Sequence, residues 1–179
     1  MKKILTILLS ASILVSCSDD FTEIDPVGSL SDAALQNATG VDLLLTGAYS
    51  VLDGIRNGGP GADWTKSGDN WWLDAISDDA HKGSTDGDQA DLLALELFSW
   101  DTTNPYILFK WNSHIKSVNR ANSVIDHINK SENPSLYDTQ LAQARFLRAH
   151  FNFELLKIWV NVPFISADNF AAGELNQPN

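Results

Sequence analysis

The chain has 179 residues, a length that allows one domain of ordinary size or part of a larger one. Hydrophobic residues make up 44% of it and six residues are tryptophan, a composition that favours a packed core over disorder. The formal net charge of -11 argues against nucleic acid as a partner, because an acidic surface repels phosphate backbones. The single cysteine excludes an internal disulfide and a multi-cysteine zinc site.

Residues 1–16 have the pattern of a signal peptide. Two lysines follow the initiator methionine, and a largely apolar run of twelve residues extends from Ile4 to Val15. A helix of that length rises about 18 Å, which is too short for a hydrocarbon core of about 30 Å. We therefore expect a cleaved targeting segment rather than a membrane-spanning helix.

The run ends in LVSC at residues 14–17, which resembles the lipobox of bacterial lipoproteins. In such signals the cysteine is acylated and becomes the first mature residue, so we expect lipid on Cys17 and an acylated tether over residues 17–30. The SDD at residues 18–20 resembles an acidic signal that directs lipoproteins of some Gram-negative lineages to the outer face of the outer membrane. A plain polar tether is the other interpretation of these residues.

The first helix of the mature chain is predicted after this tether. Apolar residues recur at three- and four-residue spacing from Val41 to Ile55, with Asn37 or Thr39 as the cap. Several glycines and a proline then forbid regular structure, so residues 53–70 are predicted to form a loop.

The middle of the chain is predicted to hold two short elements and one long helix. A short ordered piece is expected at Trp71–Ile76, and periodicity leaves Leu92–Trp100 open between helix and strand. The long helix runs from about Asn104 to Lys130. Asn122 lies on its apolar stripe and needs hydrogen-bond partners if it is buried.

The strongest helical pattern covers residues 138–159. Two apolar stripes run along this segment, one of them in a 4-3-4-3-4 rhythm, so we expect the helix to be packed on two sides. Arg145, Arg148 and Asn152 form a narrow polar edge, and we expect the arginines to pair with carboxylates of the scaffold. The first stripe comprises Ala142, Phe146, Ala149, Phe153, Leu156 and Val160, and the second Leu147, Phe151, Leu155 and Ile158.

Two long helices joined by a short turn predict an antiparallel helical hairpin, the unit of tetratricopeptide-type repeats. Trp111 and Phe146 occupy similar places in the two helices and are 35 residues apart, close to the period of such repeats. The sequence therefore predicts an all-α chain in which the last helix needs a further partner.

The stretch QARFLRAHFNFELLKIWVNVPF resembles the signature of the SusD-like (RagB/SusD) family. The segments WWLDAISDDAHKG, SVNRANSVIDHI and TGAYSVLDGI resemble three further stretches of that family. Family members usually have glycine after the aromatic residue that ends the signature helix, whereas this chain has Val160. The residues that match the signature are Ala142, Ala144, Arg145, Leu147, Arg148, Ala149, Phe153, Leu155, Trp159, Val162 and Pro163.

The resemblance implies tetratricopeptide-like helical hairpins with long loops, and it places residues 31–179 in the N-terminal part of a longer helical domain. It also implies a lipoprotein of the outer membrane that captures glycans or other nutrients and delivers them to a TonB-dependent, SusC-like transporter. Such proteins bind ligands and are not enzymes, so no cofactor is expected. Two alternatives are a lipid-anchored scaffold whose helical pairs bind only protein, and a lipid-anchored glycosidase.

Candidate ligand residues come from the stretch GADWTKSGDNWW. Sugar recognition typically combines aromatic faces with a rim of Asp, Asn and Arg side chains, so we predict ligand contacts from Trp64, Asn70, Trp71 and Trp72. The two adjacent tryptophans cannot both face one ligand from regular structure, because neighbouring side chains diverge by about 100° in a helix and by half a turn in a strand. One of them is expected in the core.

Asp78 and Asp79 suggest a carboxylate pair of the kind that hydrolyses glycosides, but adjacent residues rarely converge on one bond. We expect residues 77–79 to cap a turn or a helix instead, and no catalytic residue is assigned. The stretch DGDQAD at residues 86–91 lacks the glycine and the distal glutamate of an EF-hand, and the four histidines lack metal-ligand spacing. No metal site is predicted.

Replacing Cys17 with alanine should abolish incorporation of a labelled fatty acid, because the chain has no other thiol. Metabolic labelling followed by immunoprecipitation measures the effect, with Ser18→Ala as a variant that keeps the acceptor. Unchanged lipid incorporation in the Cys17→Ala protein would contradict the lipoprotein assignment.

Overall fold

The computed structural model describes residues 35–53, 71–85 and 87–178. All regular structure in these residues is helical, so the predicted all-α class is confirmed. Residues Gln36–Asn179 form one compact unit, and the separate unit Met1–Leu35 falls almost wholly outside the described residues. The predicted signal peptide and tether also lie outside them, as does most of the predicted loop at residues 53–70.

The long helices occupy nearly the residues that the sequence predicts, and Leu92–Trp100 resolves into a short helix followed by a turn. None of the helices in the described ranges combines the length and the apolarity that a membrane crossing requires. The elements are α3 (Ala38–Tyr49), the 3-10 turn η2 (Ser50–Asp53), α4 (Trp71–Asp74), α5 (Ala90–Glu96), α6 (Pro105–Asn129), the 3-10 turn η4 (Pro134–Tyr137), α7 (Asp138–Trp159) and α8 (Ala167–Ala171).

Local chemistry explains where the helices begin. The Asn37 side chain accepts a hydrogen bond from the backbone N–H of Gly40 and caps α3. The Asn104 side chain accepts from Tyr106 N at the start of α6, and Pro105 occupies the first turn, where its missing N–H costs nothing. A capping box formed by Ser166 and Asn169 starts α8, a helix that was not predicted from the sequence.

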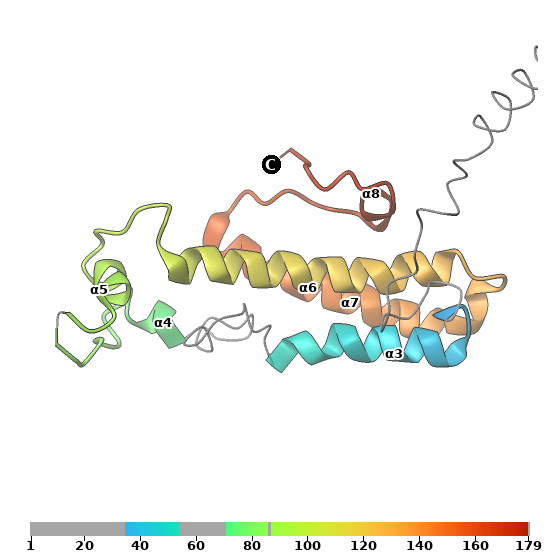
Figure 1. Ribbon diagram of the computed structural model, residues 1–179, viewed down its shortest axis with the longest axis horizontal. Helices are drawn as coiled ribbons and strands as arrows, with labels where there is room; N and C mark the ends of the chain where they lie inside the picture. Colours follow the sequence, from blue (N-terminus) through green and yellow to red (C-terminus); the bar gives the residue numbers. More distant parts are fainter. Residues whose placement is uncertain (1–34, 54–70, 86, 179) are drawn as a thin grey trace, which may run out of the picture. The chain divides into compact units, whose positions relative to one another are not determined.

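Helix α6 is the centre of the unit. It packs along α7, α3 and α8, and Figure 1 shows α6 and α7 side by side and antiparallel, joined by the turn that contains η4. Apolar side chains from all four helices fill the space between them. The buried core comprises Val41, Leu45, Ala48, Val51, Val118, Ala121, Val124, Ile125, Ile128, Ala144, Leu147, Phe151 and Ala167.

Asn122 is fully buried on α6 and finds the partners that its position demands. Its amide nitrogen donates to Ile165 O at 2.9 Å, and its amide oxygen accepts from Arg148 Nη1 at 3.1 Å. Arg148 also lies over the Phe164 ring, 5.4 Å from its centre. The side chain that Arg148 hydrogen-bonds is therefore an amide and not the expected carboxylate, and the Asp168 carboxylate acts on it only through its charge.

Only one of the two apolar stripes of α7 is packed within the described residues, and the second is left for the further partner that the sequence predicts. Leu147, Phe151 and Leu155 are buried against the rest of the bundle, whereas the stripe from Ala142 to Val160 is exposed. Residues of the two stripes project from opposite sides of the helix, since successive side chains turn by about 100°. The described neighbours cover only one side.

Val160 ends α7 with an unusual backbone. Its φ is 60° and its ψ is -62°, and Asn161 N donates to Trp159 O at 2.6 Å, which together make a γ-turn of the strained, positive-φ kind. A β-branched residue at positive φ costs about 1–3 kcal/mol. This is the position at which the resembling family usually has glycine, the one residue that adopts positive φ without a steric penalty.

His114 is a buried base in α6. Its side chain is 1% exposed, Nδ1 lies 3.0 Å from Lys110 O, and Nε2 has no hydrogen-bond partner among the described residues. Burial, assisted by the positive charge of Lys110, lowers the pKa of His114 from 6.5 to about 4. The imidazole is therefore neutral in the folded protein at neutral pH.

The stability of the fold should fall as the pH falls from about 6.5 to about 4. In this range His114 binds a proton in the unfolded chain but not in the folded chain. This difference in pKa corresponds to a loss of about 3 kcal/mol. Urea unfolding at several pH values measures it. In His114→Gln the acid-dependent loss should shrink by a comparable amount, whereas His150→Gln, which keeps the buried imidazole, should retain it. An identical pH profile for wild type and His114→Gln would contradict the assignment.

Candidate functional site

A cavity of about 440 Å³ lies where α4, the α5–α6 connection, the start of α6 and the end of α7 meet. Ligand pockets typically enclose a few hundred cubic ångströms and combine apolar walls with a few polar groups. Three tryptophans contribute to the lining of this cavity, and Asp101 and Thr102 are its polar lining residues. The lining comprises Trp72, Leu73, Ile76, Trp100, Asp101, Thr102, Ile107, Ile158 and Trp159.

The floor of the pocket belongs to a second small core. Trp72 is 1% exposed and packs against Tyr106, with ring centres 6.1 Å apart and planes tilted by 52°. Ala75, Leu92 and Leu95 complete this core. Trp72 Nε1 is buried and has no hydrogen-bond partner in the described part of the chain. Trp72 therefore has the core position that was expected of one of the adjacent tryptophans.

The predicted ligand residues are only partly described. Trp71 begins α4, but the structure does not describe its side chain. Trp64 and Asn70 lie entirely outside the described residues. Trp72 lines the cavity from its buried position. Ligand contact by these four residues stays a prediction.

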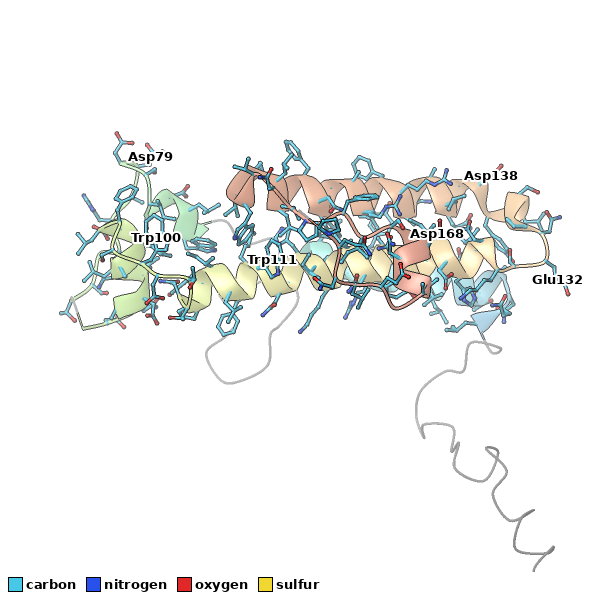
Figure 2. All side chains as sticks on the ribbon, turned by 90° about the horizontal axis from the view of Figure 1, so that it is seen from above. Asp79, Trp100, Trp111, Glu132, Asp138 and Asp168 are labelled. Atoms are coloured by element: carbon cyan, nitrogen blue, oxygen red, sulfur yellow. The ribbon has the colours of Figure 1, made fainter. Side chains whose placement is uncertain are left out.

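Phe98 and Trp100 form an exposed aromatic pair on the connection between α5 and α6. Their ring centres are 5.6 Å apart with planes tilted by 44°, and 68% of Phe98 and 38% of Trp100 are exposed. Figure 2 shows Trp100 beside α4 and α5, and Trp111 farther along α6. Of the two rings, Trp100 lines the pocket, and Phe98 packs against Trp100.

The backbone that carries Phe98 is strained. Ser99 N donates to Ala94 O at 2.9 Å and Phe98 N donates to Leu95 O at 3.1 Å, the two bonds of a Schellman motif that ends α5. Phe98 occupies the left-handed position of this motif with φ at 54°, where glycine is usual. A left-handed conformation costs a residue with a side chain about 1–2 kcal/mol. Strain that presents an exposed aromatic ring points to a functional reason for the ring.

Asp101 holds a fixed carboxylate next to Trp100. Its Oδ1 accepts hydrogen bonds from Thr103 Oγ1 at 2.6 Å and from Thr103 N at 2.8 Å. These bonds, the side-chain one first, hold the pKa of Asp101 below its ordinary value, so the group is charged at neutral pH. No described residue donates to Oδ2, which leaves that oxygen as an acceptor for a ligand hydroxyl.

Trp159 lines the pocket from the end of α7. The Trp111 ring meets it edge to face, with centres 5.1 Å apart and planes at 75°, a favoured aromatic geometry that fixes both rings. Trp100 and Trp159 were not predicted as ligand residues. The closely spaced Trp100 and Asp101 were a sequence signal for part of the lining, but nothing local to Trp159 indicates that it lines the same pocket.

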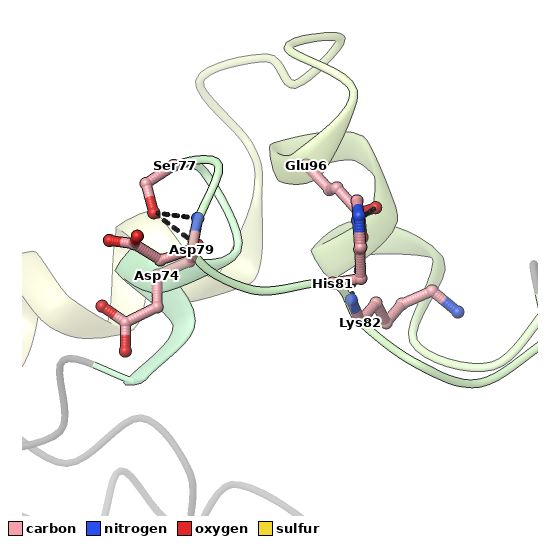
Figure 3. A network of polar contacts seen from close by, with 6 residues as sticks. All are labelled: Asp74, Ser77, Asp79, His81, Lys82 and Glu96. Atoms are coloured by element: carbon pink, nitrogen blue, oxygen red, sulfur yellow. Dashed lines mark hydrogen bonds and ion pairs between the residues drawn. The ribbon is translucent and has the colours of Figure 1, made fainter.

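A polar network holds the loop between α4 and α5 (Figure 3). Ser77 Oγ donates to Asp74 O at 2.8 Å and accepts from Asp79 N at 3.1 Å, so the predicted capping role of this stretch is confirmed. Glu96 on α5 contacts His81 Nδ1 at 2.7 Å and accepts from Lys82 N at 2.9 Å. The backbone bond from Lys82 and then the contact with His81 lower the pKa of Glu96.

This network holds the loop in place. Asp79 serves the turn through its backbone, and the described residues contain no group of three or more His, Cys, Asp or Glu side chains placed to hold a metal ion.

Replacing Phe98 tests the strain in the backbone that ends α5. Phe98→Gly should be more stable than Phe98→Ala by about 1 kcal/mol, because alanine keeps the Cβ that opposes the left-handed backbone and glycine does not. Urea unfolding of the two variants measures the difference. Equal stability of the two variants, or a more stable alanine variant, would contradict the assignment of backbone strain to Phe98.

Comparison with protein-family models matches residues 46–176 to the SusD-like family described as "Starch-binding associating with outer membrane". No curated protein matches the chain significantly. The match spans α6, α7 and α8 and all the described residues that line the pocket. Since it covers most of the sequence, the chain belongs to the SusD-like family of starch-binding, outer-membrane-associated proteins.

Proposed function

We propose that this protein is a cell-surface lipoprotein that captures a glycan and delivers it to a TonB-dependent, SusC-like transporter of the outer membrane. Members of its family are binding proteins associated with the outer membrane. The observation that carries the proposal is the pocket in which Trp100 and Trp159 line the walls and Asp101 offers an acceptor oxygen. Aromatic faces beside a carboxylate suit the apolar face and the hydroxyl groups of a pyranose.

The ligand ring would lie against the exposed face of Trp100, with Phe98 extending the aromatic surface toward a neighbouring sugar unit. A hydroxyl of the sugar would donate to Asp101 Oδ2, and the Thr102 hydroxyl could accept or donate at the same edge. The edge-to-face contact with Trp111 holds Trp159 in place without the ligand. Rigid walls favour binding, because little side-chain entropy remains to be lost.

The carboxylates of the pocket favour binding over hydrolysis. Glycosidases generally use two carboxyl groups about 5–9.5 Å apart on either side of the scissile bond. Asp101 is the only carboxylate among the described residues that line this pocket. Its lowered pKa also makes it a poor proton donor, since a general acid must be protonated near neutral pH.

The anchor would hold this pocket at the cell surface. Removal of residues 1–16 takes away two lysines and no acid, so the mature charge would be 10 − 23 = -13. Acyl chains on Cys17 would offset the repulsion from anionic headgroups, at about 0.8 kcal/mol for each buried CH₂. Asp19 and Asp20 would then serve as the outward address.

Trp100→Ala should weaken polysaccharide binding by about tenfold or more, which corresponds to about 1.4 kcal/mol of lost ring contact. Affinity electrophoresis of the protein in gels containing starch and a panel of other polysaccharides measures the retardation. Asp101→Asn, which keeps the shape and removes the charge, should weaken binding to a smaller extent.

Leu136→Ala is the matched control, because Leu136 is exposed in η4, at the end of the α6–α7 hairpin away from the pocket. Unchanged binding by the Trp100→Ala protein would show that the binding site lies outside this pocket. No retardation of the wild-type protein by any polysaccharide would count against a glycan ligand, and release of reducing sugar would favour the glycosidase.

A further inference from the structure

The stretch that supplies most of the described pocket lining is strongly acidic. Residues 71–107 contain eight acidic side chains and one lysine, a formal charge of 1 − 8 = -7 out of -11 for the whole chain. Seven of the described lining residues come from this stretch. Its acids are Asp74, Asp78, Asp79, Asp86, Asp88, Asp91, Glu96 and Asp101. The pocket therefore lies in a part of the chain where negative charge is concentrated.

The one lysine of this stretch is occupied by its own loop. Lys82 Nζ donates to Thr85 O, to Asp88 O at 2.8 Å and to Ser84 Oγ at 3.1 Å. The backbone N–H of Lys82 donates to Glu96 as well. Lys82 therefore holds the α4–α5 loop together and is not offered to a ligand in the pocket.

The other cations near the lining are also taken up within the protein. Lys157 precedes the lining residue Ile158, but its ammonium pairs with Glu154 at 2.7 Å. Lys110 of α6 is fully buried. Residues 54–70, which precede α4 outside the described residues, carry two basic and two acidic side chains, so their formal charges balance. None of the described lining residues is a cation.

The negative charge acts on the floor of the pocket. Tyr106 packs against Trp72, and burial, followed by the charges of Asp91 and Asp88, raises the pKa of the Tyr106 phenol. Asp101 lines the pocket itself, with Oδ1 held by Thr103. Since most of the lining is apolar, the field of these carboxylates is screened less than it would be in open water.

We propose that this pocket selects uncharged glycans and rejects glycans that carry carboxylate or sulfate groups, with Asp101 as the main source of the rejection. The inference rests on the proposed glycan function and names the class of glycan. An uncharged sugar offers hydroxyl groups that donate to a carboxylate, so it satisfies Asp101. A uronic acid or a sulfated sugar would bring a second negative charge to a lining that offers it no described cation, and like charges brought together oppose binding.

The test compares polymers that share a backbone and differ in charge. Hydroxyethyl starch and carboxymethyl starch of equal substitution form one pair, and hydroxyethyl cellulose and carboxymethyl cellulose form a second. Tryptophan-fluorescence titration should show the wild-type protein binding the hydroxyethyl member of a pair at least about fivefold more tightly, the effect of one charge pair at short range. The difference should narrow in about 1 M salt, where the screening length falls to about 3 Å.

Asp101→Asn should shrink the difference between the two members of a pair, because it removes the nearest charge and keeps the shape of the side chain. Glu132→Gln is the matched control. It removes one exposed carboxylate from the connection between α6 and η4, at the end of the hairpin away from Trp100 (Figure 2), and should keep the difference.

A second measurement needs no glycan. The difference between wild type and Trp100→Phe isolates the fluorescence of Trp100, which lines the pocket beside Asp101. Relative to free tryptophan amide, caesium ions should quench this fluorescence more strongly than iodide does, because a negative field attracts the cation and repels the anion. Asp101→Asn should reduce this preference, and Glu132→Gln should not.

Equal or tighter binding of a carboxymethyl polymer would overturn the inference and leave glycan binding intact. Equal quenching of Trp100 by caesium and iodide would overturn it even without a glycan. Absence of binding to all four polymers, together with preferential quenching by caesium, would instead count against the proposed glycan function. The two failures are therefore distinguishable.

Discussion

The packing of α6 against α7 is the interaction on which the rest of the described structure depends. Helix α6 is covered by α7, α3 and α8, so a polar group inside its stripes is costly to bury unless it finds partners across these interfaces. Asn122 does so by joining Arg148 of α7 to the backbone at Ile165, which leads into α8. Because the two long helices run antiparallel, the start of α6 and the end of α7 meet at one end of the hairpin, where the pocket forms.

At two helix ends an apolar residue adopts a strained backbone conformation. Phe98 follows α5 and Val160 follows α7, and both adopt a positive φ that glycine would adopt without strain. Phe98 packs against Trp100, which lines the pocket, and Val160 follows Trp159, which lines it from α7. In each case the side chain is exposed, so the core does not account for the choice of residue.

The last turn of α7 joins the pocket to the central helix. Trp159 lines the pocket, and the edge-to-face contact with Trp111 of α6 fixes its ring. This side of the pocket therefore depends on the same packing of α6 against α7 that forms the core.

The sequence by itself determined the all-α class, the extents of α6 and α7, the capping role of Ser77 and the need of Asn122 for partners. These features depend on periodicity and on side-chain chemistry within a few residues, which a sequence displays directly. The family match at residues 46–176 supports the resemblance carried by the signature helix. Only the tertiary structure decided which stripe of α7 is buried, since both are apolar and the neighbours of α7 cover one side. The tertiary structure also decided that Trp100 and Trp159 line one cavity and that Arg148 hydrogen-bonds an amide. These residues are far apart in the chain, and a local sequence pattern does not indicate which distant residues come into contact.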